Sequence, residues 1–184
     1  INNSPRREKL LDILSLILTC AVGVDPGTMQ SLVTQESGGK PYIIGVNTKP
    51  HQYFEFPDKP TATKKAIELI KQGHSVDLGL AQINSANFER LSVTVEEVLD
   101  PCTNLTLGAA ILEENYLRAI KQFGEGQAAL NAALSAYNTG NFQAGIENGY
   151  VEKVRKKYKV PAVSEAEQTE SPSWDALSNS PTVW

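Results

Sequence analysis

Apolar side chains recur every three or four residues along most of the chain, a period that predicts amphipathic helices. Residues 42–60 show no clear period, and no segment has the convincing polar and apolar alternation of a strand. The broadest stripe, in residues 104–123, predicts a central helix. The pattern predicts a mainly α fold, with helices at 7–20, 26–38, 61–73, 94–99, 104–123, 127–138 and 141–158 and a short one ending near Leu91.

Charge is unevenly distributed along the 184 residues, whose net charge is −4. Residues 160–184 contain four acidic residues and no Lys or Arg, which leaves 17 acidic against 17 basic residues in 1–159. Such a balance gives no indication of a nucleic-acid partner. We expect one folded domain at 1–159 and an acidic, largely disordered tail at 160–184, in which Trp174 and Trp184 are candidate docking anchors.

The N-terminal stretch superficially resembles a secretory signal, because Arg6, Arg7 and Lys9 precede an apolar run at 10–18. We interpret it as a helix of the mature protein, since its apolar residues have helical spacing and Asp12 interrupts the run. The chain starts without Met, and we expect that a signal peptide is absent from it. No stretch approaches the roughly 20 apolar residues that span a bilayer.

Glu36 occupies a position where the helical pattern calls for an apolar side chain. Met29, Leu32, Val33 and Glu36 stand at i, i+3, i+4 and i+7. A carboxyl group on an apolar helix face is partly desolvated, which should raise its pKa toward the range of a proton-donating acid. The structural alternative is that Glu36 marks the point where the helix leaves the core.

Four short segments carry the strongest functional signal, and they occur in order along residues 36–151: Glu36-Ser37-Gly38, Gly79-Leu80-Ala81-Gln82-Ile83, Ala136-Tyr137-Asn138-Thr139-Gly140 and Gly149-Tyr150-Val151. They resemble the four motifs of lytic transglycosylases. Three features resemble the VirB1-like branch of this family, which is associated with type IV secretion and conjugation. They are residues 43–47, residues 100–102 and the Ala of the second motif. Two positions depart from the common pattern: Gly45 stands where many members have a substrate-contacting Ser, and Ala81 removes a Met side chain from the expected cleft wall.

The resemblance implies a lysozyme-like, SLT-type helical domain with a substrate cleft. It also implies cleavage of the MurNAc-GlcNAc β-1,4 bond of peptidoglycan, with a 1,6-anhydroMurNAc product and Glu36 as the single acid and base. Ordinary glycosidases use two carboxylates instead. We interpret Glu55 as a surface or cleft-rim residue and Asp77 as a turn residue, so neither is an obvious second catalytic carboxylate.

The same resemblance implies substrate-binding roles for residues of the motifs and their neighbours. Side-chain amides and hydroxyls suit sugar hydroxyl and acetamido groups. Each candidate also has a structural interpretation, as a loop amide bonded to the backbone, a tyrosine packed in the core, or a residue that shapes a helix end. The candidates are Ser37, Gln82, Asn84, Tyr137, Asn138 and Tyr150.

Cys20 and Cys102 are far apart and lack the close spacing of a metal site. From the residues alone, a disulfide and two buried thiols are equally open; the export that the resemblance implies favours the disulfide. His51 and His74 have no metal-like spacing, and we predict no metal and no cofactor.

The resemblance further implies a periplasmic protein whose partners are peptidoglycan strands and type IV secretion components, with no nucleic acid and no membrane span. Two rival functions stay open. One is a non-catalytic assembly factor that binds peptidoglycan, suggested by the acidic tail with its two tryptophans. The other is a hydrolytic muramidase that uses water in place of the sugar's C6 hydroxyl.

Overall fold

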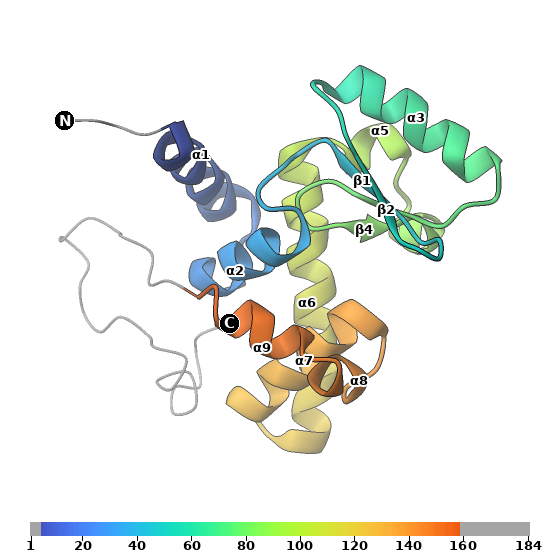
Figure 1. The fold of residues 1–184 in the computed structure, drawn as a ribbon. Coiled ribbons are helices and arrows are strands. Elements are labelled where there is room, and N and C mark those ends of the chain that lie inside the picture. The colour runs from blue at the N-terminus through green and yellow to red at the C-terminus, as the bar shows by residue number, and fades with distance from the viewer. Residues whose placement is uncertain (1–4, 159–184) are drawn as a thin grey trace. The chain divides into compact units, whose positions relative to one another are not determined.

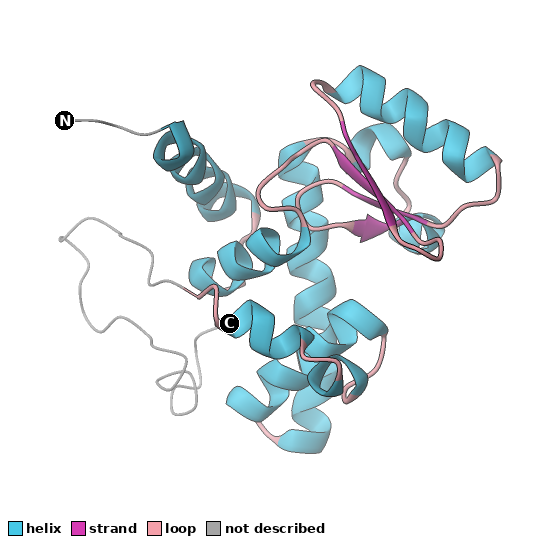
Figure 2. Cartoon of the chain, viewed as in Figure 1, coloured by secondary structure: helices cyan, strands magenta, loops and turns pink. Residues whose placement is uncertain are grey.

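The computed structural model describes the backbone of residues 5–158 and the side chains of residues 13–158. Within this part the chain is mainly helical, which confirms the predicted fold class (Figures 1 and 2). The predicted tail at 160–184 lies outside the described residues. The helices are α1 (Pro5–Cys20), α2 (Pro26–Glu36), α3 (Lys59–Lys71), η1 (Ser85–Asn87), α4 (Phe88–Leu91), α5 (Val95–Val98), α6 (Pro101–Phe123), α7 (Gln127–Thr139), α8 (Ala144–Glu147) and α9 (Tyr150–Arg155).

The chain divides into two compact units. Within the described residues, unit 1 comprises residues 5–21 and 36–108, and unit 2 comprises residues 22–35 and 109–158. Unit 1 therefore holds the sheet and the helices α1 and α3 to α5, whereas unit 2 holds most of α2 and the helices α7 to α9.

Unit 1 contains a four-stranded antiparallel sheet, so the expectation of no strand was wrong. The strands are β1 (Ile43–Val46), β2 (Gln52–Glu55), β3 (Val76–Leu78) and β4 (Ile83–Asn84), in the spatial order β2-β1-β3-β4. One face carries the fully buried side chains of Ile44 and Leu78, which are cross-strand partners. Helix α3 contacts β1 and β3 and buries Ala62, Ala66 and Leu69, and its N-terminus is capped by Asp58.

Helix α6 begins three residues earlier than predicted. The Asp100 carboxylate accepts hydrogen bonds from the backbone N–H of Thr103 (2.9 Å) and from its hydroxyl (3.0 Å). Pro101 is the first helical residue, a position where the missing N–H costs no helical hydrogen bond. The Asp-Pro pair, which follows the C-cap of the preceding short helix, thus starts α6.

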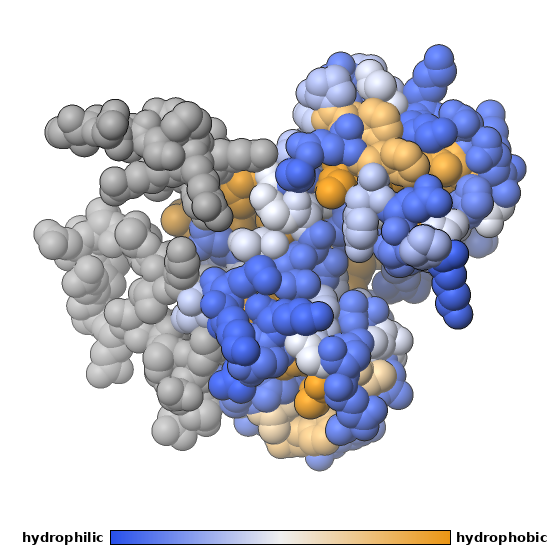
Figure 3. Space-filling model, in the orientation of Figure 1, coloured by the Kyte–Doolittle hydropathy of each residue, from blue (hydrophilic) through white to orange (hydrophobic). Residues whose placement is uncertain are grey.

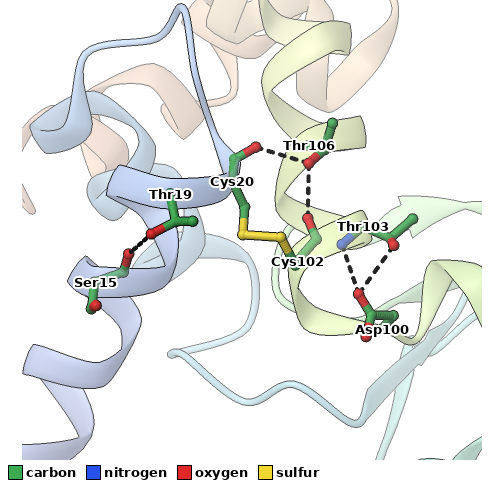
Figure 4. Close-up of a disulfide and its surroundings, with 7 residues drawn as sticks. All are labelled: Ser15, Thr19, Cys20, Asp100, Cys102, Thr103 and Thr106. Atoms are coloured by element: carbon green, nitrogen blue, oxygen red, sulfur yellow. Dashed lines mark hydrogen bonds between the residues drawn. A yellow bond between two sulfur atoms is a disulfide. The ribbon is translucent and has the colours of Figure 1, made fainter.

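Cys20 and Cys102 form a disulfide that links the end of α1 to the start of α6 within unit 1 (Figure 4). The hydroxyl of Thr106 donates to the carbonyl oxygens of Cys20 (2.8 Å) and Cys102 (3.0 Å), so hydrogen bonds reinforce the link. The bond spans a sequence separation of 82 residues. In the chain-entropy model, closing a loop of this length raises the free energy of the unfolded chain by about 4.5 kcal/mol, which stabilises the folded protein by the same amount.

Unit 2 packs α7 against α8 through a close backbone approach. The Ser135 hydroxyl donates to the Asn141 carbonyl (2.6 Å) and accepts from the Gly145 N–H (2.8 Å). A Cβ on Gly145 would lie 2.6 Å from the Cα of Ser135, so only glycine fits. The single helix predicted for 141–158 is two helices, because Gly149 adopts a left-handed conformation (φ +78°) between α8 and α9.

Tyr158 packs on the start of α2 within unit 2. The Asp25 carboxylate, 8% exposed, caps this helix by accepting from the Thr28 N–H (2.7 Å). A Cβ on Gly27 would lie 2.7 Å from the Tyr158 ring, which shows how closely the ring approaches. Burial, followed by the charge of Asp25 and a hydrogen bond with it, raises the pKa of Tyr158 to about 12.

We expect Tyr158 to make stability depend on pH between about 10 and 12. Because its folded-state pKa lies above the ordinary value of 10.0, its contribution is complete below pH 10 and is lost as pH rises toward 12. The variant Tyr158→Phe should be about 1 kcal/mol less stable at neutral pH and should lack this part of the alkaline decline. Urea unfolding at several pH values measures both, and parallel declines in the two proteins would contradict the prediction.

Candidate active site

Glu36 is the last residue of α2, and it follows the apolar stripe that the sequence predicted. Met29, Leu32 and Val33 are at most 1% exposed, whereas Glu36 is half-buried. Ser37 is buried, and its hydroxyl oxygen accepts a hydrogen bond from the Gly39 N–H (3.2 Å). The helix therefore ends in a turn that begins immediately after the carboxyl-bearing residue.

The second motif forms a tight turn between β3 and β4. Gly79 has φ +79° and Gln82 has φ +49°, so two of its residues are in the left-handed region. The Gln82 amide donates to the carbonyl oxygens of Gly79 (2.9 Å) and Ile43 (3.4 Å), which holds its side chain against β1. Ala81, which stands where the common pattern has a Met, is fully buried.

A buried amide outside the motifs, that of Asn104, holds this turn in place. Its nitrogen donates to the carbonyl oxygens of Leu78 and Val98 (2.8 Å each), and its oxygen accepts from the Ala81 N–H (2.7 Å). A Cβ at position 79 would lie 2.4 Å from that nitrogen, so the Asn104 side chain fits here only because residue 79 is glycine. Sequence reasoning missed Asn104 because two of its partners lie 23 and 26 residues away.

The sheet face opposite the apolar one carries a row of cross-strand partners from all four strands. Gly45 pairs with Tyr53 and with Asp77, and Asp77 pairs with Asn84. Directly paired residues point to the same face, so these four positions form one line across the sheet. A Cβ on Gly45 would lie 2.9 Å from the Gln82 Oε1, 3.3 Å from the Tyr53 ring and 3.6 Å from the Asp77 Cβ. The Gln82 amide thus borders the space that a side chain at position 45 would need.

Asp77 lies in β3, so its interpretation as a turn residue was wrong. One carboxylate oxygen accepts from the Asn84 amide (2.7 Å) and the other from the Asn47 amide (2.8 Å). Burial raises the pKa of Asp77 above its ordinary value, while the two amides and the charge of His51 oppose that rise. Glu55, in contrast, is exposed and paired with Lys40, as expected of a surface residue.

The remaining candidates belong to unit 2. Tyr137 is half-buried on α7, Asn138 is exposed beside it, and Tyr150 begins α9 with only 6% exposure. The Asn148 side chain connects two of them, because it donates to the Asn138 amide oxygen (3.1 Å) and accepts from the Tyr150 N–H (2.9 Å). The structure thus groups the predicted residues by unit: Glu36, Ser37, Gln82 and Asn84 in unit 1, and Tyr137, Asn138 and Tyr150 in unit 2.

A hollow on the surface of unit 1 contains none of these candidates. It is lined by residues of α3 and α5: Lys59, Pro60, Thr63, Lys64, Ile67 and Glu96.

Among residues 5–158, no helix combines the length and apolar character needed to cross a membrane. The face drawn in Figure 3 is mostly hydrophilic, with apolar side chains gathered in smaller patches.

Residues 15–160 match the family model of the transglycosylase SLT domain, and the chain therefore belongs to this lysozyme-like family. All four motifs fall inside the matched range. Among its relatives is the protein virB1 of Agrobacterium fabrum, 38% identical over 135 residues, which are 73% of this chain and 54% of that protein. The type IV secretion system protein virB1 of Brucella abortus is 39% identical over 153 residues, 79% of this chain and 63% of that protein.

The protein virB1 of Rhizobium radiobacter is 38% identical over 151 residues, 81% of this chain. The chain spans 54% to 63% of the length of these curated relatives. No solved structure matches it.

Proposed function

We propose that this chain is a peptidoglycan lytic transglycosylase that cleaves the MurNAc-GlcNAc β-1,4 bond and leaves a 1,6-anhydroMurNAc end. The observation that carries the proposal is the SLT match over residues 15–160, with a half-buried Glu36 directly after a buried apolar stripe. A carboxyl group in such a position is suited to exchange protons rather than to bind cations.

In the proposed reaction Glu36 donates its proton to the glycosidic oxygen while the bond from that oxygen to C1 breaks. The substrate's N-acetyl group stabilises the positive charge left on the sugar. The C6 hydroxyl then attacks C1 and returns its proton to the Glu36 carboxylate, so atoms balance and no water is consumed. An intramolecular hydroxyl replaces water efficiently because its effective concentration is high.

We assign substrate contacts to Gln82 and Asn84 in unit 1 and to Tyr137, Asn138 and Tyr150 in unit 2, with Ser37 as the residue that fixes the turn after the acid. Gln82 and Asn84 are supported by their place on the polar side of the sheet. We also propose that residues 1–159 form the transglycosylase domain and 160–184 a separate tail. All three relatives are named virB1, and the Brucella protein is also named for the type IV secretion system, which supports a periplasmic role in opening the wall for such an apparatus.

Digestion of purified sacculi, followed by mass spectrometry of the released muropeptides, tests the proposal. We expect products that end in 1,6-anhydroMurNAc. Reducing ends in their place would indicate a hydrolytic muramidase. Folded protein that binds sacculi but releases nothing would contradict an enzyme and favour an assembly factor.

A further inference from the structure

Helix α2, which ends at Glu36, is contacted near both of its ends by the residues that follow α9. Near the start of α2, the Tyr158 ring lies so close that a Cβ on Gly27 would be 2.7 Å from it (Figure 1). Near the end of α2, the Lys157 ammonium donates a hydrogen bond of 2.6 Å to the side-chain oxygen of Gln35. Two consecutive residues therefore hold α2 over most of its length.

The turn that carries these two residues is fixed to the core of unit 2. In α9, Val151 and Val154 are 4% and 0% exposed, so the helix is anchored by buried side chains. The turn continues from α9 through backbone hydrogen bonds, because the Lys157 N–H donates to the Val154 carbonyl (2.9 Å) and the Tyr158 N–H to the Arg155 carbonyl (3.0 Å). The Lys157 side chain thus reaches α2 from a well-held backbone.

The contact between Lys157 and Gln35 is specific to this pair. Both side chains belong to half-buried residues, and among the described residues neither forms another hydrogen bond or ion pair. A hydrogen bond from an ammonium is stronger than one between neutral groups. The preceding Lys156 differs, since its side chain is 73% exposed and its ammonium lies 3.6 Å from the Glu152 carboxylate on α9. Only the second of these adjacent lysines is therefore linked to α2.

Glu36 is the last residue of α2 and follows Gln35 directly. The last turn of a helix lacks part of the helical hydrogen bonds, so side-chain contacts contribute strongly to holding it in place. In the proposed reaction the Glu36 carboxyl group must reach first the glycosidic oxygen and then the C6 hydroxyl. A displacement of about 1 Å can lower the rate of such a step by about 10²-fold. A contact that fixes the last turn of α2 therefore matters for the chemistry.

We propose that Lys157 is a positioning residue for the reaction, which acts through Gln35 to fix the last turn of α2 and with it the Glu36 carboxyl group. The inference rests on the proposed function. Lys157 itself contacts no substrate and transfers no proton in this scheme. Its role is hidden from the sequence, because the two hydrogen-bonded residues lie 122 positions apart.

The variant Lys157→Met tests the proposal with a soluble tetrasaccharide of alternating GlcNAc and MurNAc as substrate. Methionine keeps an unbranched side chain but cannot donate to Gln35, so we expect kcat to fall about tenfold or more. KM should stay within about twofold of wild type, because no substrate contact is lost. The variant Lys157→Arg keeps the charge and the donors, so its kcat should be within about threefold of wild type.

Lys156→Met is the matched control, since it removes the same charge one residue earlier without touching α2. Its kcat should stay within about twofold of wild type, as expected for an exposed surface ion pair. An equal loss in the two Met variants would overturn the inference, because attraction between the positive charge and the glycan would then explain it. A kcat of Lys157→Met within about threefold of wild type would also overturn it and leave the proposed function intact. An inactive wild type would overturn both.

A double variant shows whether Lys157 acts through Gln35. Gln35→Met removes the acceptor of the same hydrogen bond, so it should lower kcat about as much as Lys157→Met does. Combining the two should lower kcat no further, whereas independent effects would multiply to about a hundredfold and would refute the proposal. Thermal unfolding of every variant sets an assay temperature at which all are folded. A fall in kcat at constant KM then reports the position of Glu36 and not a loss of folded protein.

Discussion

The variant Glu36→Gln is expected to release no detectable 1,6-anhydro product from sacculi, a loss of about 10³-fold or more. Glutamine keeps the shape of the side chain at the end of α2 but has no proton to give to the leaving oxygen and no carboxylate to take one from C6. Because Glu36 serves in both halves of the proposed reaction, its loss should affect bond cleavage and ring closure together. Binding to sacculi should change little, since the amide still accepts and donates hydrogen bonds.

Glu55→Gln is the matched control for this experiment. Glu55 is exposed and ion-paired with Lys40 on the surface of unit 1. An exposed pair of this kind contributes little to stability, so the control should retain wild-type product yield and stability within about 1 kcal/mol. Equal product from wild type and Glu36→Gln would remove Glu36 from the mechanism. If Glu36→Gln also supported secretion-system assembly as well as wild type, a binding role for the protein would be favoured.

The largest effect on stability is expected from Asn104→Leu. The two side chains have similar volumes, but Leu leaves the Ala81 N–H and the carbonyl oxygens of Leu78 and Val98 without their partner in a fully buried place. Each unsatisfied buried group costs about 1–3 kcal/mol, so the three together should cost the variant roughly 3–9 kcal/mol. This is a large share of the total stability of about 5–15 kcal/mol that is typical of a domain.

Chemical denaturation of wild type and Asn104→Leu measures this loss. Asn131→Leu on α7 is the control, because that half-buried amide accepts from the side chain of Gln127 and should cost less than about 1 kcal/mol. Asn104→Asp keeps the acceptor for Ala81 but turns a buried carboxylate oxygen toward the carbonyl oxygens of Leu78 and Val98, so it should lose at least as much stability as the Leu variant. A loss below about 1 kcal/mol in Asn104→Leu would show that water satisfies the turn and that Asn104 does not hold it.

The helices were predictable because their signal is local and long. The stripes at 104–123 and 127–138 repeat over several turns, and the structure places helices at Pro101–Phe123 and Gln127–Thr139. The strands were not predictable because they contain two to four residues each, too few for an alternating pattern. Their pairing joins segments as far apart as Ile44 and Leu78, which no local pattern encodes.

In the candidate site, too, the residues with a local sequence signal were predictable and those positioned by distant contacts were not. Glu36 was singled out by its place on an apolar helical stripe, a relation between residues at most seven positions apart, and the resemblance of the four motifs gave it the role of the acid. Asp77 was misinterpreted as a turn residue, whereas the turn begins only after β3 has ended at Leu78. What gives Asp77 its environment is contact with Asn47, 30 residues earlier, so only the folded sheet reveals it.

The disulfide also determines how the chain responds to cleavage. All four strands and α3 to α5 lie between Cys20 and Cys102, inside one covalent ring. A protease that cuts any single peptide bond within this ring opens it without releasing a fragment. The catalytic candidates of unit 1 then remain on one molecule until a reductant separates the two pieces. Intact mass on a non-reducing gel would therefore conceal a nick that a reducing gel reveals.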